Sequence, residues 1–524
     1  MFSVALSLFL SGYVQAGPLT RAERSGFKET STYADVIRFL NELKATGAPI
    51  DIRFSGTSTE GKKIPMVIAA RPMVKDPAEA AKSGKLIVYI QANIHAGEVE
   101  GKEAALHLLR RYCDKSSKVL DKTILIVQPI YNIDGNEKFG PQARNRPGQN
   151  GPESVGLRPN GQNLDLNRDC MKVESPEMQG VLKYIYPWNP HAMFDLHTTD
   201  GTRHGYQMTY AGPLYPNTNP AIQNYELDEL LPTIRKTIKT KFNRDLFDYG
   251  NGETDKDKNW RFETFGGEPR YVTNYAGLRN TLSILSEAMV YETFQDRIKD
   301  TEELVDESLQ KMIADAGRIK AMRRQADAQI VKWGNNPASA PELATRYKMH
   351  LRGTEPVLFE KNLLAGGRRS GPVRDVETIN MPVYDRFEGD RFTKLPYGYI
   401  VPKLATKALE LLRLHGVEVS ELAETQPKFT VEEMMVTKFD QAKGAFQGHK
   451  LITLEGEWKP TNQHIEGYFV RTGQPLGLLT FELLQPDTID GLTAWGFFGE
   501  SFSVNSTHPV LRVSLPARIN LKRN

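Results

Sequence analysis

Short, uninterrupted apolar runs alternate with amphipathic stretches through the first two thirds of the chain. The apolar runs fall at residues 86–92, 123–130, 192–196 and 282–285, and such runs are typical of strands buried on both faces of a mainly parallel sheet. Apolar residues at helical spacing predict helices over 30–44, 100–112 and 220–242, and two further strands are expected at 50–54 and 64–70. This alternation predicts an α/β fold with a mixed, mainly parallel sheet flanked by helices, and a site at the carboxyl ends of its strands.

The pattern changes after a long helix expected over residues 295–332. Residues 334–341 have the composition of a linker, because Gly, Asn, Pro and Ser dominate them. Short strand-like runs follow at 346–351, 399–401, 450–454, 464–470 and 511–515, with one helix at 403–415. We therefore expect a first domain over residues 17–333 and a second, mostly β domain over 342–524, with a sandwich as the candidate architecture.

Composition excludes several classes of protein. The 524 residues are 40% hydrophobic and 25% charged, so there is enough apolar material for a core and disorder is not expected. The net charge of +3 gives no electrostatic reason to expect nucleic acid as a partner. No stretch is long and apolar enough for a membrane span. Two cysteines are too few for a disulfide framework or a thiolate zinc site.

The N-terminus resembles an export signal. Residues 2–14 form an apolar run too short to span a bilayer, and Val14-Gln15-Ala16 provides a small-residue cleavage site, although no Lys or Arg precedes the run. We expect a signal peptide over 1–16 and a secreted or periplasmic protein; the alternative is an N-terminal element docked on the core. Export would allow Cys113 and Cys170 to pair, whereas the other interpretation is two separate buried thiols.

Residues that can hold a metal follow two of the buried strands. His95 and Glu98 lie directly after the run at 86–92, and His197 ends the run at 192–196. Two imidazoles and one carboxylate suit zinc and leave a fourth position open for water. His191 and His204 are the competing histidines: His191 falls at the opposite end of its strand, whereas His204 can still line a pocket.

Two further segments carry candidate chemistry. In the segment 163–169, Asn167 and Arg168 offer an amide and a planar guanidinium that suit a free carboxylate, and Asp165 can orient His95. Glu287 ends the apolar run at 282–285, where desolvation would raise its pKa and suit it to general-base work. The competing interpretations are a solvated loop at 163–169, an ion pair of Glu287 with Arg279, and Glu292 as the relevant carboxylate.

Taken together, these residues resemble the zinc metallocarboxypeptidases of the carboxypeptidase A/B-like family. The resemblance covers roughly residues 30–299 and rests on an ordered set of short motifs: His95-x-x-Glu98, Asn132-Ile133-Asp134-Gly135, Asp165-Leu166-Asn167-Arg168, His197 and Glu287. It implies a carboxypeptidase-like fold, one zinc ion per chain held by His95, Glu98 and His197, binding of a C-terminal carboxylate by Asn167 and Arg168, and Glu287 as general base. It also implies an arginine that polarises the scissile carbonyl, for which Arg158 is the first choice and Arg146 the second.

The chain also departs from that family in places. Ile133 stands where proline is usual. A tyrosine that covers the substrate is expected before the catalytic Glu, and both Tyr271 and Tyr275 are candidates. The residue that sets side-chain specificity is expected near 268–271, where Arg270 would favour acidic side chains. The region after residue 342 is longer than the small β domain of some members and is similar to the C-terminal region of large bacterial ones.

The expected function is therefore hydrolysis of C-terminal amino acids from peptides, by attack of a zinc-bound water that Glu287 activates. The substrate is expected to be a peptide or peptide-like molecule with a free carboxylate. One alternative is a zinc amidohydrolase acting on N-acyl amino acids or peptidoglycan stem peptides, which also carry a free carboxylate. The other is a non-catalytic binding protein, which would be expected to have lost at least one of the five key residues. No Gly-x-Ser-x-Gly elbow or phosphate-binding Gly-rich loop is present.

Overall fold

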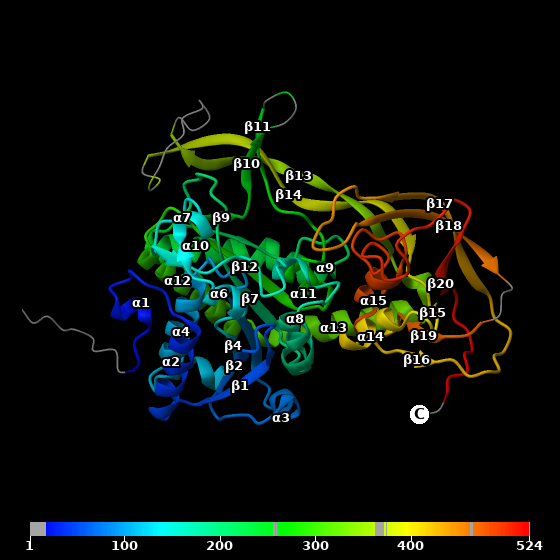
Figure 1. Cartoon of the computed structure of the whole chain (residues 1–524), viewed down its shortest axis with the longest axis horizontal. Helices are drawn as coiled ribbons and strands as arrows, with labels where there is room; N and C mark the ends of the chain where they lie inside the picture. The colour runs from blue at the N-terminus through cyan, green and yellow to red at the C-terminus, as the bar shows by residue number, and fades with distance from the viewer. Residues whose placement is uncertain are drawn as a thin grey trace, which may run out of the picture.

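A computed structural model describes residues 17–254, 257, 259–361, 371, 373, 375–461 and 465–522. The expected signal peptide at 1–16 lies outside the described residues. No helix in the described ranges is long and apolar enough to cross a membrane. Figure 1 shows the two parts of the chain side by side, with the N-terminal part in blue to green and the C-terminal part in yellow to red.

An eight-stranded mixed sheet forms the centre of the N-terminal part, in the order β1-β2-β4-β3-β7-β12-β8-β9. Strands β3, β4, β7 and β12 run parallel to their neighbours in the middle, whereas β1 and β2 pair antiparallel at one edge. All four middle strands are buried along their whole length, as their apolar sequences predict. The expected α/β fold with a mixed, mainly parallel sheet is confirmed. The strands of this sheet are β1 (Ile50–Thr57), β2 (Lys63–Ala70), β3 (Leu86–Ala92), β4 (Thr123–Gln128), β7 (Ala192–Thr198), β8 (Met208–Ala211), β9 (Leu246–Asp248) and β12 (Leu282–Ala288).

Helices cover both faces of this sheet. On one face, α2, α4, α10 and α12 contribute to a single apolar core with the strands, and α8 and α11 pack on the other. Helix α2 begins with a capping box formed by Thr32 and Asp35. The long helix expected over 295–332 is two helices, because the chain breaks at Asp315. The helices of this part are α1 (Arg21–Arg24), α2 (Tyr33–Ala45), α3 (Pro77–Lys82), α4 (Glu100–Cys113), α5 (Val119–Lys122), α6 (Ile133–Glu137), α7 (Gln142–Asn145), α8 (Pro176–Gly180), α9 (Pro220–Asn224), α10 (Leu231–Phe242), α11 (Val272–Leu278), α12 (Phe294–Ala314) and α13 (Ala316–Asn335).

The C-terminal part is built on two sheets. One sheet contains a long hairpin of β13 (Glu342–Glu360) and β14 (Val376–Lys394). A short hairpin of the N-terminal part, β10 (Asn251–Thr254) and β11 (Trp260–Glu263), joins the same sheet, because β11 pairs with β14. Figure 1 shows the long hairpin crossing over both parts. A six-stranded sheet follows, with two helices beside it: β15 (Gly398–Val401), β16 (Ser420–Glu421), β17 (Val431–Gln441), β18 (Ile452–Thr461), β19 (Tyr468–Arg471), β20 (Thr507–Val513), α14 (Thr406–Leu414) and α15 (Gly477–Leu484).

The two parts share one apolar core. Trp188 and Tyr275 from the N-terminal part belong to the same buried cluster as Leu479 and Trp495 from the C-terminal part. The expected linker is itself packed: a side chain at Gly334 would meet the backbone nitrogen of Gly473 at 2.2 Å, so only glycine fits there. The C-terminal part is therefore packed against the sheet that carries the predicted site.

The two cysteines do not form a disulfide. Cys113 and Cys170 are both buried and free, and they lie in the cores on opposite faces of the central sheet. Of the two interpretations of the sequence, separate buried thiols are the one that the structure contains.

Candidate active site

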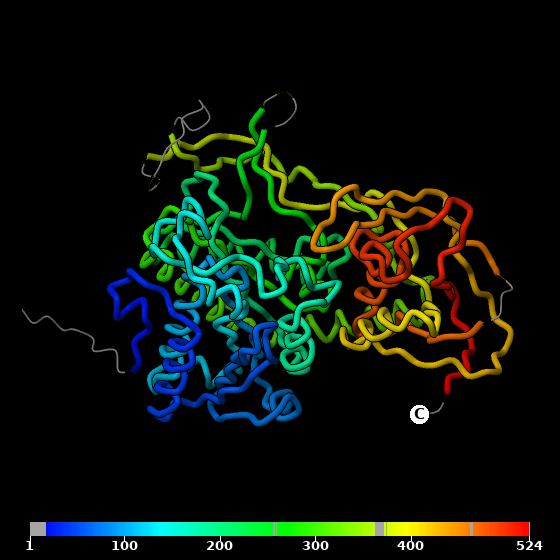
Figure 2. The backbone as a smooth tube through the Cα atoms, in the orientation of Figure 1, coloured from blue at the N-terminus to red at the C-terminus, as the bar shows by residue number. Residues whose placement is uncertain are grey.

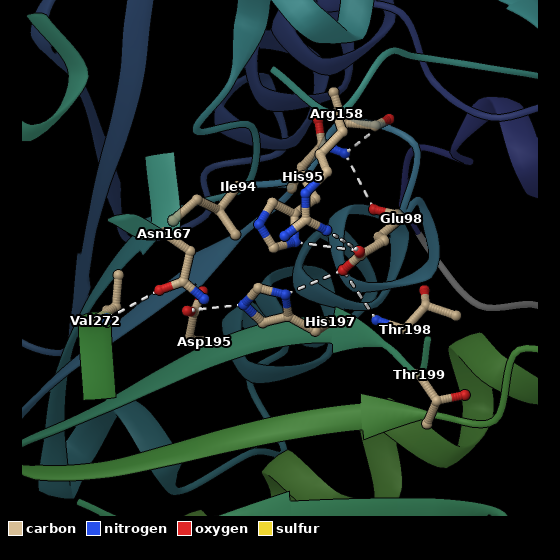
Figure 3. A network of polar contacts seen from close by, with 12 residues as sticks. Ile94, His95, Glu98, Arg158, Asn167, Asp195, His197, Thr198, Thr199 and Val272 are labelled. Atoms are coloured by element: carbon tan, nitrogen blue, oxygen red, sulfur yellow. Dashed lines mark hydrogen bonds and ion pairs between the residues drawn. The ribbon is translucent and has the colours of Figure 1, made fainter. Parts of the chain in front are cut away.

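The three predicted metal ligands meet at the carboxyl end of the sheet. His95 and Glu98 lie in the loop between β3 and α4, and His197 is on β7, the strand beside β3. Nδ1 of His95 lies 3.1 Å from Oε1 of Glu98, and Nδ1 of His197 lies 3.0 Å from Oε2 of the same carboxylate. Figure 3 shows both imidazoles directed at Glu98. All three side chains are buried.

Carboxylates hold the outer nitrogens of both imidazoles. Nε2 of His95 lies 3.0 Å from Asp165, and Nε2 of His197 lies 2.8 Å from Asp195. Asp195 is in turn fixed by the amide of Gln91 on the neighbouring strand, at 3.0 Å. These contacts leave Nδ1 of each ring as the atom available to an ion, which is how histidine ligands are usually oriented.

The donor set fits zinc. Two imidazole nitrogens and one carboxylate oxygen lie within 4.8 Å of one another, and tetrahedral zinc takes such donors at about 2.0–2.2 Å. Although burial favours the protonated form, the charges of Arg146 and His95 hold the pKa of Glu98 well below its usual range. Glu98 is therefore a carboxylate, the form that binds a cation.

Glu287 lies beside the ligands on the next strand. It is the register partner of His197 in the parallel pair β12 and β7, so both side chains leave the sheet at the same level. Burial raises the pKa of Glu287 well above its usual range, and the neighbouring charge of Glu98 adds to this effect. Within the described part of the chain, Oε2 of Glu287 has no hydrogen-bond partner. Arg279, the alternative partner considered from sequence, contacts Tyr275 and His415 instead.

Two arginines reach the carboxylate of Glu98. Nη1 of Arg158 lies 3.5 Å from Oε1 of Glu98, and Nη1 of Arg146 lies 3.3 Å from the same oxygen. Arg158 also makes two hydrogen bonds to Asp165 and keeps 40% of its side chain exposed. Arg146 is less exposed and donates to the carbonyls of Thr198 and Thr199. Arg158 is thus the arginine with more access to a substrate.

Asn167, Arg168 and Tyr271 form a second group in the same cavity. Oδ1 of Asn167 accepts a hydrogen bond from the backbone of Val272 at 2.9 Å, which fixes the amide beside the first turn of α11. The guanidinium of Arg168 stacks on the ring of Tyr271, 4.3 Å from its centroid. An amide and a cation held this way can bind a carboxylate.

The cavity itself measures about 150 Å³. It is lined by the three predicted metal ligands, Glu287, both candidate arginines, Asn167, Arg168 and Tyr271, but not by Tyr275, Arg270 or Asp165. It also contains residues that sequence reasoning missed, namely Thr198, Asp200, Tyr249, Phe265, Thr273 and Leu285. Tyr249 and Leu285 pack together with Phe265 beside them, so one wall is apolar. Of these residues, only Leu285 could have been found from the sequence. It lies two residues before Glu287 in the same strand, and residues two apart in a strand point to the same face.

Several sequence candidates lie elsewhere. Tyr275 is fully buried and bonds Nδ1 of His415 at 2.7 Å, so it faces the core and Tyr271 remains the candidate. Arg270 pairs with Asp490 at 2.9 Å and lies outside the cavity. Nδ1 of His191 accepts a hydrogen bond from the backbone N–H of Ile87, at the opposite end of the sheet. From the sequence, His204 remained a candidate to line the pocket. It is instead buried beside Tyr206, and it is not among the residues that line the cavity.

Comparison with known proteins agrees with this geometry. Residues 37–284, which span the sheet from α2 to β12, match the sequence profile of the family described as "Zinc carboxypeptidase". Over these residues, which carry the candidate site, the chain is similar to the zinc carboxypeptidases. The chain is accordingly a zinc-dependent hydrolase that acts on peptide C-termini, and its fold is carboxypeptidase-like.

Similar proteins extend the match beyond residues 37–284. "Carboxypeptidase 2" of Trichophyton tonsurans is 22% identical over 484 residues, covering 87% of this chain and 81% of the relative. A match of that extent includes the C-terminal part. "Carboxypeptidase Z" of Mus musculus is 31% identical over 147 residues, 26% of this chain and 21% of the relative.

Solved structures similar to this chain include the metallo-carboxypeptidase from Burkholderia cenocepacia, with 16% identity and a TM-score of 0.40 over 55% of this chain and 70% of that chain. Carboxypeptidase A from Helicoverpa armigera has 15% identity and a TM-score of 0.41, over 56% of this chain and 75% of that one.

Proposed function

We propose that the chain removes single C-terminal residues from peptides, with His95, Glu98 and His197 holding one zinc ion. The observation that carries this proposal is the shared cavity: a metal-type triad, the buried carboxylate Glu287 and a carboxylate-binding group line one space of about 150 Å³. When bound, zinc would polarise the scissile carbonyl and lower the pKa of a water molecule.

Asn167 and Arg168 select the chain end. The amide of Asn167 is held by Val272, and the guanidinium of Arg168 is held against Tyr271, so both are positioned before substrate binds. A charged fork of this kind binds a free carboxylate and has no comparable partner in an internal peptide bond. Tyr271 is the candidate to cover the bound residue.

Glu287 acts as the base. Its pKa is raised, and its Oε2 has no hydrogen-bond partner among the described residues. Both features suit Glu287 to take a proton from the attacking water and to pass it to the leaving amine. Arg158, whose side chain is 40% exposed and whose guanidinium lies beside Glu98, stabilises the oxyanion that forms on the carbonyl oxygen. Arg146 is the second candidate for this role.

An apolar side chain is the best fit for the specificity part of the cavity. Tyr249, Phe265 and Leu285 form its apolar wall, and Arg270 is neutralised by Asp490 outside it. The acidic preference considered from sequence therefore has no support in this arrangement. We infer preference for an aliphatic or aromatic C-terminal residue.

A panel of peptides tests the proposal. It would contain free and amidated C-termini with apolar, acidic and basic last residues, together with N-acyl amino acids and peptidoglycan stem peptides. Stepwise loss of one apolar residue from free-acid peptides supports a carboxypeptidase. Cleavage of N-acyl amino acids or stem peptides with no action on ordinary peptides would support an amidohydrolase instead. We also propose export through the segment 1–16, which N-terminal sequencing of the mature protein would test.

A further inference from the structure

A tight hairpin turn of the C-terminal part has an unusual residue at its tip. Phe446 and His449 exchange two backbone hydrogen bonds, of 2.8 and 3.0 Å, around Gln447 and Gly448. Both central residues have left-handed backbone, with φ of +50° for Gln447 and +83° for Gly448. Glycine, asparagine and aspartate are the usual choices there, because a longer side chain is strained at positive φ. Such strain is typical of a position that is needed for something other than stability.

The Gln447 side chain reaches the active site. Its Oε1 accepts a hydrogen bond of 2.8 Å from the backbone N–H of Asp165. The carboxylate of Asp165 then holds His95 through one oxygen and Arg158 through the other. One hydrogen bond from the C-terminal part therefore fixes the residue that orients both a metal ligand and the candidate oxyanion-stabilising arginine.

The tip is held on both sides of Gln447. Nε2 of His449 lies 2.8 Å from Oε1 of Glu174, and the guanidinium of Arg270 stacks 5.2 Å from the ring centroid of Phe446. Arg270 is itself fixed by Asp490. Figure 2 shows the orange segment of the turn extending towards the cyan and green tube of the catalytic part. The turn is thus anchored to the catalytic part by three of its four residues, Phe446, Gln447 and His449.

We propose that Gln447 is a positioning residue of the active site, and that the C-terminal part supplies it. The proposal rests on the function proposed above, since it assumes that Asp165 orients a zinc ligand. Asp165 also accepts from the backbone N–H of Asn167 at 3.0 Å, so its carboxylate and backbone are both restrained. Removing the Gln447 contact frees the backbone side of that arrangement while leaving every residue that lines the cavity unchanged.

Three variants separate positioning from folding. Gln447→Met keeps the length and the strained backbone but has no acceptor. Gln447→Gly also lacks the acceptor and relieves the strain, and Gln447→Glu keeps an acceptor oxygen. Lys443→Met, an exposed change in the same segment, is the control. Each full-length protein would be compared with wild type for zinc affinity by chelator competition, for kcat and KM on a free-acid peptide, and for Tm.

We expect Gln447→Met and Gln447→Gly to lose zinc affinity and kcat by the same factor, about 3–10-fold. This is less than the 10–100-fold typical when a direct partner of a metal ligand is removed. Gln447→Gly would nevertheless melt about 1–2 °C above Gln447→Met, and Gln447→Glu would stay within about twofold of wild type in zinc affinity. Wild-type values in all variants, or recovery of function in Gln447→Gly in step with its Tm, would overturn the proposal. A wild-type protein that neither binds zinc nor cleaves the peptide would overturn the proposed function itself.

Discussion

Replacing Arg168 by methionine tests how the enzyme recognises a chain end. The side chain is 21% exposed, and its guanidinium is held by the carbonyl of Asn167 at 2.8 Å and by the ring of Tyr271. Methionine retains the aliphatic stem against that ring and removes only the charged fork. The change therefore removes carboxylate binding with little effect on packing.

The expected magnitude follows from the interaction that is lost. A hydrogen-bonded, charge-assisted contact to a carboxylate contributes roughly 1.5–3 kcal/mol, which corresponds to about 10–150-fold. We expect Arg168→Met to lower kcat/KM for a free-acid peptide by that factor and to change little for the same peptide as a C-terminal amide. Arg168→Lys should fall between the two, because it keeps the charge without the fork.

The assay is a comparison of acid and amide forms of one peptide with wild type, Arg168→Met and Arg168→Lys. Arg318→Met is the control, since Arg318 is half-exposed on α13 and contacts Glu229 and the ring of Tyr225, neither of which lines the cavity. An Arg168→Met enzyme that still prefers the acid form as strongly as wild type does would refute the assignment.

Three further predictions concern the base, a buried histidine and Arg270. Glu287→Gln should bind zinc normally by chelator competition and lose about 10²–10⁴-fold in kcat; full activity would rule out Glu287 as base. Burial lowers the pKa of His107, but the hydrogen bonds to Glu23 and Glu302 outweigh it and raise this pKa to about 9. Because the folded pKa exceeds the ordinary value of 6.5, the stabilisation is full below about pH 6.5 and is lost as the pH rises through 9. The Tm of the wild type should therefore fall more than the Tm of His107→Gln as the pH rises from about 6.5 to 9. An equal fall in both proteins would count against this stabilising role of His107. Arg270→Met leaves Asp490 buried without its cation, so the Tm should drop while the preference among acidic and apolar peptides stays unchanged, which the peptide panel measures.

Much of the catalytic part could be predicted from sequence because its signals are local. Strands such as β3 and β7 are continuous apolar runs, and a residue placed directly after such a run must lie at the edge of the sheet. His95, Glu98 and His197 could therefore be brought together without coordinates. The register that sets Glu287 beside His197 follows from the same reasoning, since β7 and β12 are parallel neighbours.

The remaining features depend on contacts between distant segments. Nothing near Tyr275 in the sequence indicates that His415 will bury it, and nothing near Arg270 indicates that Asp490 will neutralise its charge. The apolar wall at Tyr249 and Phe265 likewise comes from loops with no regular pattern. Strand β14 was missed because its faces alternate weakly, and its pairing with β11 is set by tertiary packing.

The most direct test of the central claim is the zinc content of the purified protein, measured together with its peptide products. The account predicts one zinc per chain, loss of activity on chelation, restoration by added zinc, and products shortened one residue at a time from the C-terminus. His197→Ala should bind zinc far more weakly and produce none of these products. Full activity without bound metal, or cleavage of internal peptide bonds only, would contradict the account.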